Sequence, residues 1–483
     1  MIDRRQFLQA AGVAAWAACS RRGGSVSAAP SPRFAPDVDL ALHATLRDVA
    51  VLSGASTACW VFQGELLRGA PDTLTPGPRD SYLGPTIRVR TGQKLRIRLS
   101  SDLPEPTIVH WHGLHVPAAA DGHPADAISA GQSFVYEFEV QDRAGTYWYH
   151  AHPDMLTGPQ VYRGLAGLFI VSDAEEAALA LPRGELDLAL VLQDRSFDAQ
   201  NQLVYASGGM AAMAGFHGDR ILCNGRPEAS LTRPARAHRL RVLNGSNARI
   251  YRLAWSDGAP LVVLGTDGGL LARAVRLPSL WLAPGERVEL WRDLAPLAGA
   301  RLALVSLPLG PRDRAYQLVE LVVDRAGAAA ATPPQRLTAP RLLWLGDAVN
   351  AARPREIALR MAHMSFTLAG RSFAMDEVAD DEKIPLGSVQ AWRFDNRAGQ
   401  MGMMGMAMPH PMHIHGGQFR VVERTGAPRN DVFDQGWKDT VLVMPGETVT
   451  VVMRFADHRG RFLYHCHNLE HEDRGMMRNY LVV

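Results

Sequence analysis

The residues best suited to chemistry lie in one short segment, residues 465–476, which reads His-Cys-His-Asn-Leu-Glu-His-Glu-Asp-Arg-Gly-Met. If this segment enters as a β-strand, alternate side chains face opposite ways, so His465 and His467 point to one side and Cys466 to the other. A thiolate, two imidazoles and a weak thioether together form a blue-copper electron-transfer site. Cys466, His471 and Met476 supply all of these ligands except one histidine. The segment therefore predicts two metal centres joined through one strand.

The missing histidine and further paired histidines lie in three other motifs. In residues 410–416, His-Pro-Met-His-Ile-His-Gly, strand parity places His413 and His415 on one face and His410 on the other. His410 can then complete the site at Cys466. We expect the paired histidines of all the motifs to gather in one cluster: they are His110, His112, His150, His152, His413, His415, His465 and His467.

The number of imidazoles indicates what such a cluster could do. Eight suit three copper ions, two ligands for one ion and three for each of the others, and a fourth copper would sit at Cys466. Dioxygen needs four electrons to become water, which four one-electron metals can deliver. A single His-x-His pair is more often a surface pair or a core histidine than a metal site. Because the four motifs carry ten of the 17 histidines, we favour the metal interpretation.

These motifs resemble those of the multicopper oxidases, nearest the bacterial copper-efflux oxidases and laccase-like enzymes. The resemblance covers nearly the whole mature chain and includes the linking segments 267–271 and 283–287. It implies one type 1 copper, one type 2 copper and a type 3 pair per chain, with dioxygen as electron acceptor. It also implies that the type 1 copper lies near the surface through His410 and His471, where electrons are taken up. Met476 as its long axial ligand would keep the reduction potential low.

The same resemblance places two acids beside the cluster. Dioxygen reduction consumes protons inside a buried site, so a carboxylate within hydrogen-bond reach is needed. Glu472 directly follows His471, and Asp121 follows the first histidine pair on its loop. The resemblance implies that both act in proton delivery, whereas the alternative for each is an ordinary loop carboxylate.

The first and last thirds of the chain are copies of one unit. Residues 131–152 align without a gap on residues 446–467, and His-Trp-His-Gly at 110–113 matches His-Ile-His-Gly at 413–416. Ala151 stands where Cys466 stands in the last copy, so the first copy has no thiolate. The middle third carries a related segment but no histidine pair. We therefore expect the histidine cluster at the interface of the outer units, with four ligands from each.

Alternating apolar residues indicate how each unit folds. Phe134, Tyr136, Phe138 and Val140 share one face of a predicted half-buried strand. The last unit has the same pattern in Val449, Val451, Met453 and Phe455. No long amphipathic helix is evident. The sequence predicts an all-β protein of three cupredoxin-like Greek-key β-sandwich domains, at residues 37–173, 174–325 and 337–483.

The N-terminal 28 residues predict export. Arg4 and Arg5 precede an apolar stretch, which resembles a twin-arginine (Tat) signal with cleavage after Ala28. This predicts passage through the Tat export machinery and a periplasmic location. An ordinary helix with a basic start is the alternative, and lipoprotein anchoring at Cys19 fits poorly. Two other cysteines, at positions 59 and 223, could form a disulfide in that compartment or remain buried thiols.

Composition excludes some partners. The 483 residues carry a formal net charge of +2, so neither nucleic acid nor an acidic surface is implied. No apolar run is long enough to span a bilayer.

A methionine-rich stretch around His410 suggests a substrate. Thioethers are soft donors that favour Cu(I), so cuprous ions could dock there and be oxidised, as in copper detoxification. The alternative is a flexible hydrophobic plug. The methionines are Met401, Met403, Met404, Met406, Met408 and Met412.

Two departures from the copper-efflux relatives keep other functions open. Their long methionine-rich insertion is not evident, and Met406 stands where they have a substrate-site aspartate. Phenols or aromatic amines therefore remain alternative reductants. A non-enzymatic copper store and a periplasmic scaffold of the same fold are the alternatives from other classes.

Overall fold

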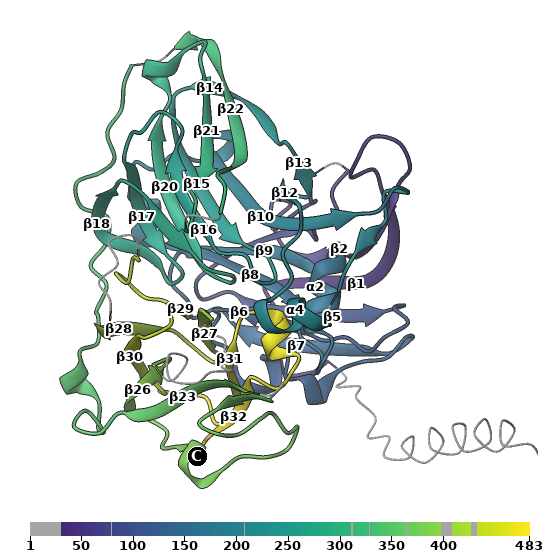
Figure 1. Cartoon of the computed structure of the whole chain (residues 1–483), viewed down its shortest axis with the longest axis vertical. Helices are drawn as coiled ribbons and strands as arrows, with labels where there is room; N and C mark the ends of the chain where they lie inside the picture. Colours follow the sequence, from purple (N-terminus) through teal and green to yellow (C-terminus); the bar gives the residue numbers. More distant parts are fainter. Residues whose placement is uncertain are drawn as a thin grey trace, which may run out of the picture.

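The computed structural model describes residues 30–78, 80–206, 208–310, 313–327, 329–362, 365–397, 408–426 and 432–483. Within this part of the chain the strands form three β-sandwiches of two sheets each (Figure 1). The predicted all-β class is confirmed. The predicted signal segment, residues 1–28, lies outside the described residues. Among the described helices, none has the length and apolar character needed to cross a bilayer.

The first sandwich (domain 1) carries two of the histidine pairs on its second sheet. The first sheet has the order β2-β1-β5-β7 and the second the order β3-β4-β9-β8-β6. The strands are β1 Val38–Val49, β2 Thr57–Arg68, β3 Leu74–Thr75, β4 Thr86–Arg90, β5 Lys94–Ser101, β6 Val109–His112, β7 Ser133–Glu139, β8 Gly145–Ala151 and β9 Ala166–Ser172.

The second sandwich (domain 2) forms the upper part of Figure 1. Its larger sheet has the order β13-β12-β10-β15-β20-β17-β18, with β11 paired to β10, and its smaller sheet the order β14-β22-β21-β16-β19. The strands are β10 Asp187–Phe197, β11 Leu203–Val204, β12 Arg220–Cys223, β13 Arg226–Pro227, β14 Ser230–Ala235, β15 Ala237–Asn244, β16 Tyr251–Trp255, β17 Leu261–Thr266, β18 Gly269–Leu277, β19 Leu280–Leu282, β20 Arg287–Asp293, β21 Arg301–Ser306 and β22 Tyr316–Gly327.

The third sandwich (domain 3) carries the other two histidine motifs on adjacent strands, β27 and β31. Its sheets have the orders β24-β23-β26-β30-β28 and β25-β32-β31-β27-β29. The strands are β23 Arg355–Ala362, β24 Ser365–Leu368, β25 Lys383–Ile384, β26 Val389–Asp395, β27 His410–Ile414, β28 Phe419–Thr425, β29 Thr440–Val443, β30 Thr448–Arg454, β31 Gly460–Cys466 and β32 Met477–Val482.

Described helices are short, as expected for a sequence without long amphipathic segments. The α-helices are α2 Thr157–Arg163, α3 Ala174–Ala177, α4 Gly209–Ala214 and α5 Leu469–Glu472. The 3₁₀ turns are η1 Ala118–Ala120, η2 Pro124–Asp126, η3 Gly184–Leu186, η4 Ala295–Leu297, η5 Leu345–Asp347 and η6 Asp380–Glu382. Two of the α-helices belong to different domains but lie side by side: α4 of domain 2 and α5 of domain 3 (Figure 1).

Apolar alternation explains the strands that position the site. In β7, Phe134, Tyr136 and Phe138 are buried, while the residues between them are partly exposed, as predicted for a strand with one wet face. In β30 the prediction of a half-buried strand is wrong, because both faces are covered. Val452, on the face opposite Val451, packs against Leu343 in the segment that precedes β23. Each sandwich holds its own apolar core between its sheets.

The two cysteines whose pairing could not be predicted from the sequence are free thiols. Cys59 and Cys223 are both buried and form no disulfide. Burial raises the pKa of each thiol to about 12, so both are protonated at neutral pH and behave as small apolar core residues.

Candidate metal centre

The predicted sulfur site forms where β27 and β31 pair antiparallel. Met412 lies opposite Cys466 and His413 opposite His465, which places His410 on the same face as Cys466. The His410 Nδ1 atom is 3.4 Å from the Cys466 Sγ atom, and the His471 Nδ1 atom is 3.6 Å from the same sulfur. We call His410, Cys466, His471 and Met476 the thiolate site.

Local structure brings the last two members of the thiolate site back to the strand. Asn468 caps helix α5, with its side chain accepting from the His471 amide, so the chain turns directly after β31. The Cys466 amide donates to the Met476 carbonyl at 3.0 Å, and Met476 is fully buried. The turn of α5 therefore returns the chain beside Cys466.

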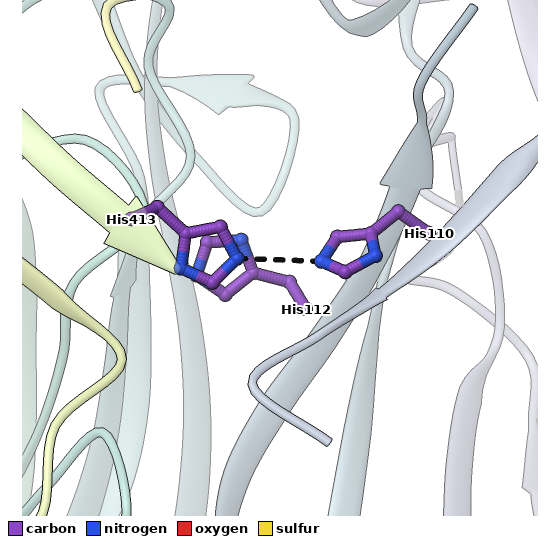
Figure 2. A group of neighbouring side chains, drawn as sticks. All are labelled: His110, His112 and His413. Carbon is purple, nitrogen blue, oxygen red and sulfur yellow. Dashed lines mark hydrogen bonds between the residues drawn. The ribbon is translucent and has the colours of Figure 1, made fainter. Parts of the chain in front are cut away.

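The eight paired histidines form one cluster between domains 1 and 3, which we call the histidine cluster. Figure 2 shows His110 and His112 of β6 facing His413 of β27, with the Nε2 atoms of His110 and His413 3.3 Å apart. Ligand atoms within 4.8 Å of one another form three trios: His110, His112 and His413; His112, His150 and His467; and His152, His415 and His465. The predicted contribution of four histidines from each outer domain is confirmed.

Burial lowers the pKa of seven of these imidazoles and so favours their neutral form: His110, His112, His150, His152, His413, His415 and His467. Each of the eight is at most 1% exposed. Burial, with further lowering from neighbouring imidazoles, lowers the pKa of His150 to about 3. Burial also lowers the pKa of His152 to about 4, although the nearby Glu472 carboxylate opposes this. Neutral imidazoles carry the free lone pair that a metal ion requires.

Unpartnered nitrogens show that the histidine cluster fits metal ions. His150 Nε2, His152 Nδ1 and both ring nitrogens of His467 are buried without a hydrogen-bond partner. An unsatisfied buried polar group costs about 1 to 3 kcal/mol, so several at one point are not explained as core packing. Imidazole suits copper, and the thiolate site adds the soft sulfur that copper also accepts. The donor set therefore fits copper.

Asp121 lies against the histidine cluster, as predicted. Its Oδ2 atom is 2.7 Å from His415 Nδ1, and its backbone carbonyl accepts from His110 Nδ1 at 2.7 Å. The carboxyl group is fully buried, and burial raises its pKa well above the ordinary value. Asp121 is therefore suited to hold a proton.

Glu472 lies on the other side of the histidine cluster. Its Oε2 atom is 3.0 Å from His465 Nδ1, and its Oε1 atom is 3.5 Å from His152 Nε2. Burial alone would raise the pKa of Glu472, but His465 and His152 outweigh this and hold it below the ordinary value. Two acids whose surroundings push their pKa values apart are typical of proton-transfer sites.

Asp439 and Arg287 also hold the histidine cluster, and the sequence did not reveal them. Asp439 Oδ1 is 3.0 Å from His112 Nε2, and Arg287 of β20 binds both carboxylate oxygens of Asp439 at 2.6 and 2.7 Å. Thr440 Oγ1 lies 3.0 Å from the same His112 nitrogen. Domain 2 supplies no paired histidine but reaches the histidine cluster through this arginine. Arg287 lies in segment 283–287, which resembles a linking segment of the multicopper oxidases but offers no metal ligand.

The two histidines expected to bring the thiolate site to the surface are themselves covered. His410 is 2% exposed and His471 fully buried. His471 Nε2 donates a hydrogen bond to the Met213 carbonyl of helix α4 at 3.0 Å. A loop of domain 2 therefore covers the imidazole edge, and no local sequence pattern near His471 indicates this.

The methionines divide into three groups. Met412 is fully buried in the core of domain 3, opposite Cys466, so its predicted role in docking a substrate at the surface is wrong. Met408 is partly buried against that same core, two residues before His410. The remaining predicted methionines lie outside the described residues: Met401, Met403, Met404 and Met406.

Two carboxylates clamp helix α5 to the other domains. Glu470 accepts from the Tyr205 hydroxyl at 2.8 Å and from the Phe216 amide at 3.0 Å, both in domain 2. Asp473 accepts from the amides of Thr157 and Gly158 at 2.9 and 2.8 Å, both in α2 of domain 1. All three domains therefore fix the helix that carries His471.

Three β-sandwiches with a histidine cluster between the outer two and a buried thiolate site beside it define a copper protein. Two family profiles described as multicopper oxidase match residues 73–176 and 350–483. The chain is 33% identical to multicopper oxidase mco of Staphylococcus haemolyticus, covering 83% of each sequence. The crystal structure of the McoA multicopper oxidase of Aquifex aeolicus superposes with a TM-score of 0.80 at 34% identity, covering 93% of this chain and 97% of that one.

The chain therefore belongs to the multicopper oxidase family, and it is a copper-dependent oxidoreductase that uses dioxygen. The similarity also extends to cell division protein FtsP of Dickeya dadantii, at 29% identity over 98% of this chain and 97% of that one.

Proposed function

We propose that the protein binds four copper ions per chain, one at the thiolate site and three in the histidine cluster, and couples oxidation of a one-electron reductant to reduction of dioxygen to water. One arrangement carries this proposal. Three trios of buried histidines lie together, and two of these histidines, His465 and His467, flank Cys466 in sequence. The Cys466 sulfur in turn has two imidazole nitrogens beside it. When bound, the copper ions supply reversible one-electron exchange with the reductant and with dioxygen.

Cys466 joins the two centres. Burial raises the pKa of its thiol well above the ordinary value, so the thiolate forms only when a cation binds there. Its neighbours in sequence, His465 and His467, both belong to the histidine cluster, so one short stretch of backbone connects the two centres. Electrons taken up at the thiolate site can follow this route.

Asp121 and Glu472 supply and receive protons for dioxygen reduction. Asp121, with its raised pKa, holds a proton at its carboxyl group and can donate it. Glu472, with its lowered pKa, stays ionised and can accept a proton beside His465 and His152. Each turnover to water consumes four protons, so both groups must be reprotonated during the cycle.

The favoured reductant is the cuprous ion. Five methionines lie in residues 401–408, immediately before His410, and thioethers favour Cu(I) over harder ions. The reaction would convert Cu(I) into Cu(II) and so serve copper detoxification. Phenols or aromatic amines are the alternative substrates. The paired arginines near the N-terminus support export through the Tat machinery to the periplasm.

Dioxygen uptake by the copper-loaded protein in an oxygen electrode tests the proposal. We expect sustained uptake on addition of Cu(I), with four cuprous ions consumed per dioxygen, and slower uptake on addition of a phenol. Faster uptake with the phenol would overturn the favoured substrate. A copper store would bind Cu(I) without sustained uptake, and a scaffold would give no response to either reductant.

The scaffold alternative is kept because the similarity includes a cell division protein. The full set of buried ligands argues against it here, since a scaffold has no need to leave several imidazole nitrogens unpartnered in its interior.

A further inference from the structure

A short loop of domain 2 occupies the place where a reductant would meet His471. The loop comprises residues 208–215 and contains helix α4, which lies beside α5 (Figure 1). The Met213 carbonyl accepts the hydrogen bond from His471 Nε2 at 3.0 Å, and the Met213 side chain packs against the core of domain 3. Because His471 Nδ1 faces Cys466, Nε2 is the outer nitrogen of this ring. The loop thus covers the outer edge of the imidazole.

The two ends of the loop are held together on domain 3. The rings of Tyr205 and Phe216, which flank the loop, lie with centroids 5.2 Å apart. Both residues bind the Glu470 carboxylate, one through its hydroxyl and the other through its amide. A loop whose ends meet in this way is an independent surface unit. It can be shortened without moving the residues that anchor it.

Gly215 allows the close approach of the loop to α5. Its φ is +84°, and a Cβ atom there would lie 2.2 Å from Ala248 Cβ and 2.6 Å from Asn468 Nδ2. Gly209, at the other end of α4, has a φ of +59° but has nothing within 4 Å of the corresponding position. Both positions have a positive φ, which glycine adopts without strain, but only at Gly215 would a side chain also clash with neighbouring atoms.

We propose that the loop of residues 208–215 determines reductant specificity: it keeps aromatic molecules off the edge of His471 and leaves small reductants to deliver electrons at the half-buried Met213. An aromatic ring needs a wide contact with the imidazole edge, whereas a metal ion needs only one point of approach. Electron transfer slows steeply with distance, so a molecule held outside the loop reacts slowly. For cuprous ions, four Cu(I), one dioxygen and four protons give four Cu(II) and two water molecules. This inference rests on the proposed function.

Deletion of residues 209–214 tests the inference directly. It joins Gly208 to Gly215 and leaves four residues between Tyr205 and Phe216, which suffices because these residues already meet. We expect the ratio of kcat/KM for an aromatic amine to kcat/KM for Cu(I) to rise by about tenfold or more, which corresponds to a modest change in barrier. The blue colour should persist, because no thiolate-site residue is removed. An unchanged ratio in a blue, folded variant would overturn the proposal.

Acylation of histidine by diethyl pyrocarbonate gives a second readout that needs no activity. In the copper-free full-length protein, peptide mass mapping should find His471 unmodified, and in the deletion variant it should find His471 modified. Modification of His471 in the unaltered protein would contradict the inference. If both proteins failed to take up dioxygen, the proposed function would be refuted, and acylation would still show whether the loop covers His471.

Two glycine variants keep the inference falsifiable if the deletion variant does not fold. Gly215→Ala must displace the end of α4 from Ala248 and from Asn468, the cap of α5, so it should raise both the amine-to-Cu(I) ratio and the acylation of His471. Gly209→Ala places the same methyl group at a similar backbone conformation in open space and should change neither. Equal behaviour of the two variants would count against the loop.

Discussion

Domains 1 and 3 carry the same strand pair, yet only one of them holds a thiolate site. In domain 1, β6 pairs with β8 so that Val109 lies opposite Ala151 and His110 opposite His150. In domain 3, β27 pairs with β31 so that Met412 lies opposite Cys466 and His413 opposite His465. The register is the same, and in both pairs the paired histidines face the domain interface.

The difference between the two strand pairs lies on their other face. By equivalent backbone pairing, domain 1 has no imidazole or thiol where domain 3 has its thiolate site: Thr107, Ala151, Gln160 and Leu165 stand at the positions of His410, Cys466, His471 and Met476. Ala151, Gln160 and Leu165 are fully buried in domain 1. The comparison teaches that the histidine cluster needs only one face of each strand pair, while the opposite face can be either core or metal site.

The largest expected effect follows from making domain 3 resemble domain 1. Cys466→Ala should abolish the blue colour, remove one copper per chain and stop dioxygen uptake, because no other thiolate lies at the thiolate site. The remaining copper should stay in the histidine cluster, whose imidazoles are unchanged. Visible absorption and metal analysis would measure this. Cys223→Ala, which removes a buried thiol elsewhere, is the control, and a blue Cys466→Ala protein would contradict the assignment.

Comparison of the two acids gives the next effect. Glu472→Gln keeps an acceptor oxygen near His465 but cannot take up a proton, so turnover should fall by about a hundredfold, within the usual range for general acid–base catalysis, with copper content intact. Asp121→Asn should slow turnover in the same way. Oxygen uptake and metal analysis on each purified variant would measure this. Loss of copper in place of loss of rate would show that Glu472 has a structural role.

A smaller effect tests whether domain 2 supports the histidine cluster through Arg287. Arg287→Met leaves the Asp439 carboxylate buried without its partner, and breaking a buried pair in this way costs about 3 to 5 kcal/mol of unfolding free energy. The control is Arg301→Met, since Arg301 forms a pair with Glu320 while its side chain is 67% exposed. Such an exposed pair contributes little to stability, because solvent screens it. Denaturant unfolding of the two variants should therefore differ clearly, and similar losses would contradict the role of Arg287.

The smallest effect concerns pH and the copper-free protein. The folded-state pKa values of His150, His152 and His471 are lowered to about 3, 4 and 4, whereas an unfolded histidine titrates near 6.5. As the pH falls below about 6.5, the unfolded chain binds protons that the folded chain does not, so stability decreases. The Tm of the copper-free protein should fall between pH 7.5 and about 4.5. A Tm independent of pH over this range would show that these imidazoles are not buried as neutral bases.

The sequence predicted much of this arrangement because strand parity and spacing are local properties. His-x-His pairs on strands place both imidazoles on one face, and the gapless match of residues 131–152 to residues 446–467 predicts equivalent positions in two domains. The same parity rule places Met412 on the face of His410, and the strand pairing puts it opposite Cys466 in the core. Nearness in sequence alone therefore does not group the methionines by function.

Contacts between distant segments could not be predicted in this way. Asp439 and Arg287 meet across 152 residues, and Met213 reaches His471 across 258. No period or motif in a single sequence links such positions. The burial of His471 and the contact of Asp439 with His112 therefore depend on how the three domains are arranged in space.

The clamps on helix α5 have a consequence for biogenesis. Glu470 fastens the helix to domain 2 and Asp473 fastens it to domain 1, while Asn468 starts it in domain 3. We therefore expect the four residues of the thiolate site, all from domain 3, to reach their final arrangement only after domains 1 and 2 have docked on α5. Development of colour in a refolding mixture would report the final step of assembly, and metal insertion would serve as a checkpoint on the whole polypeptide.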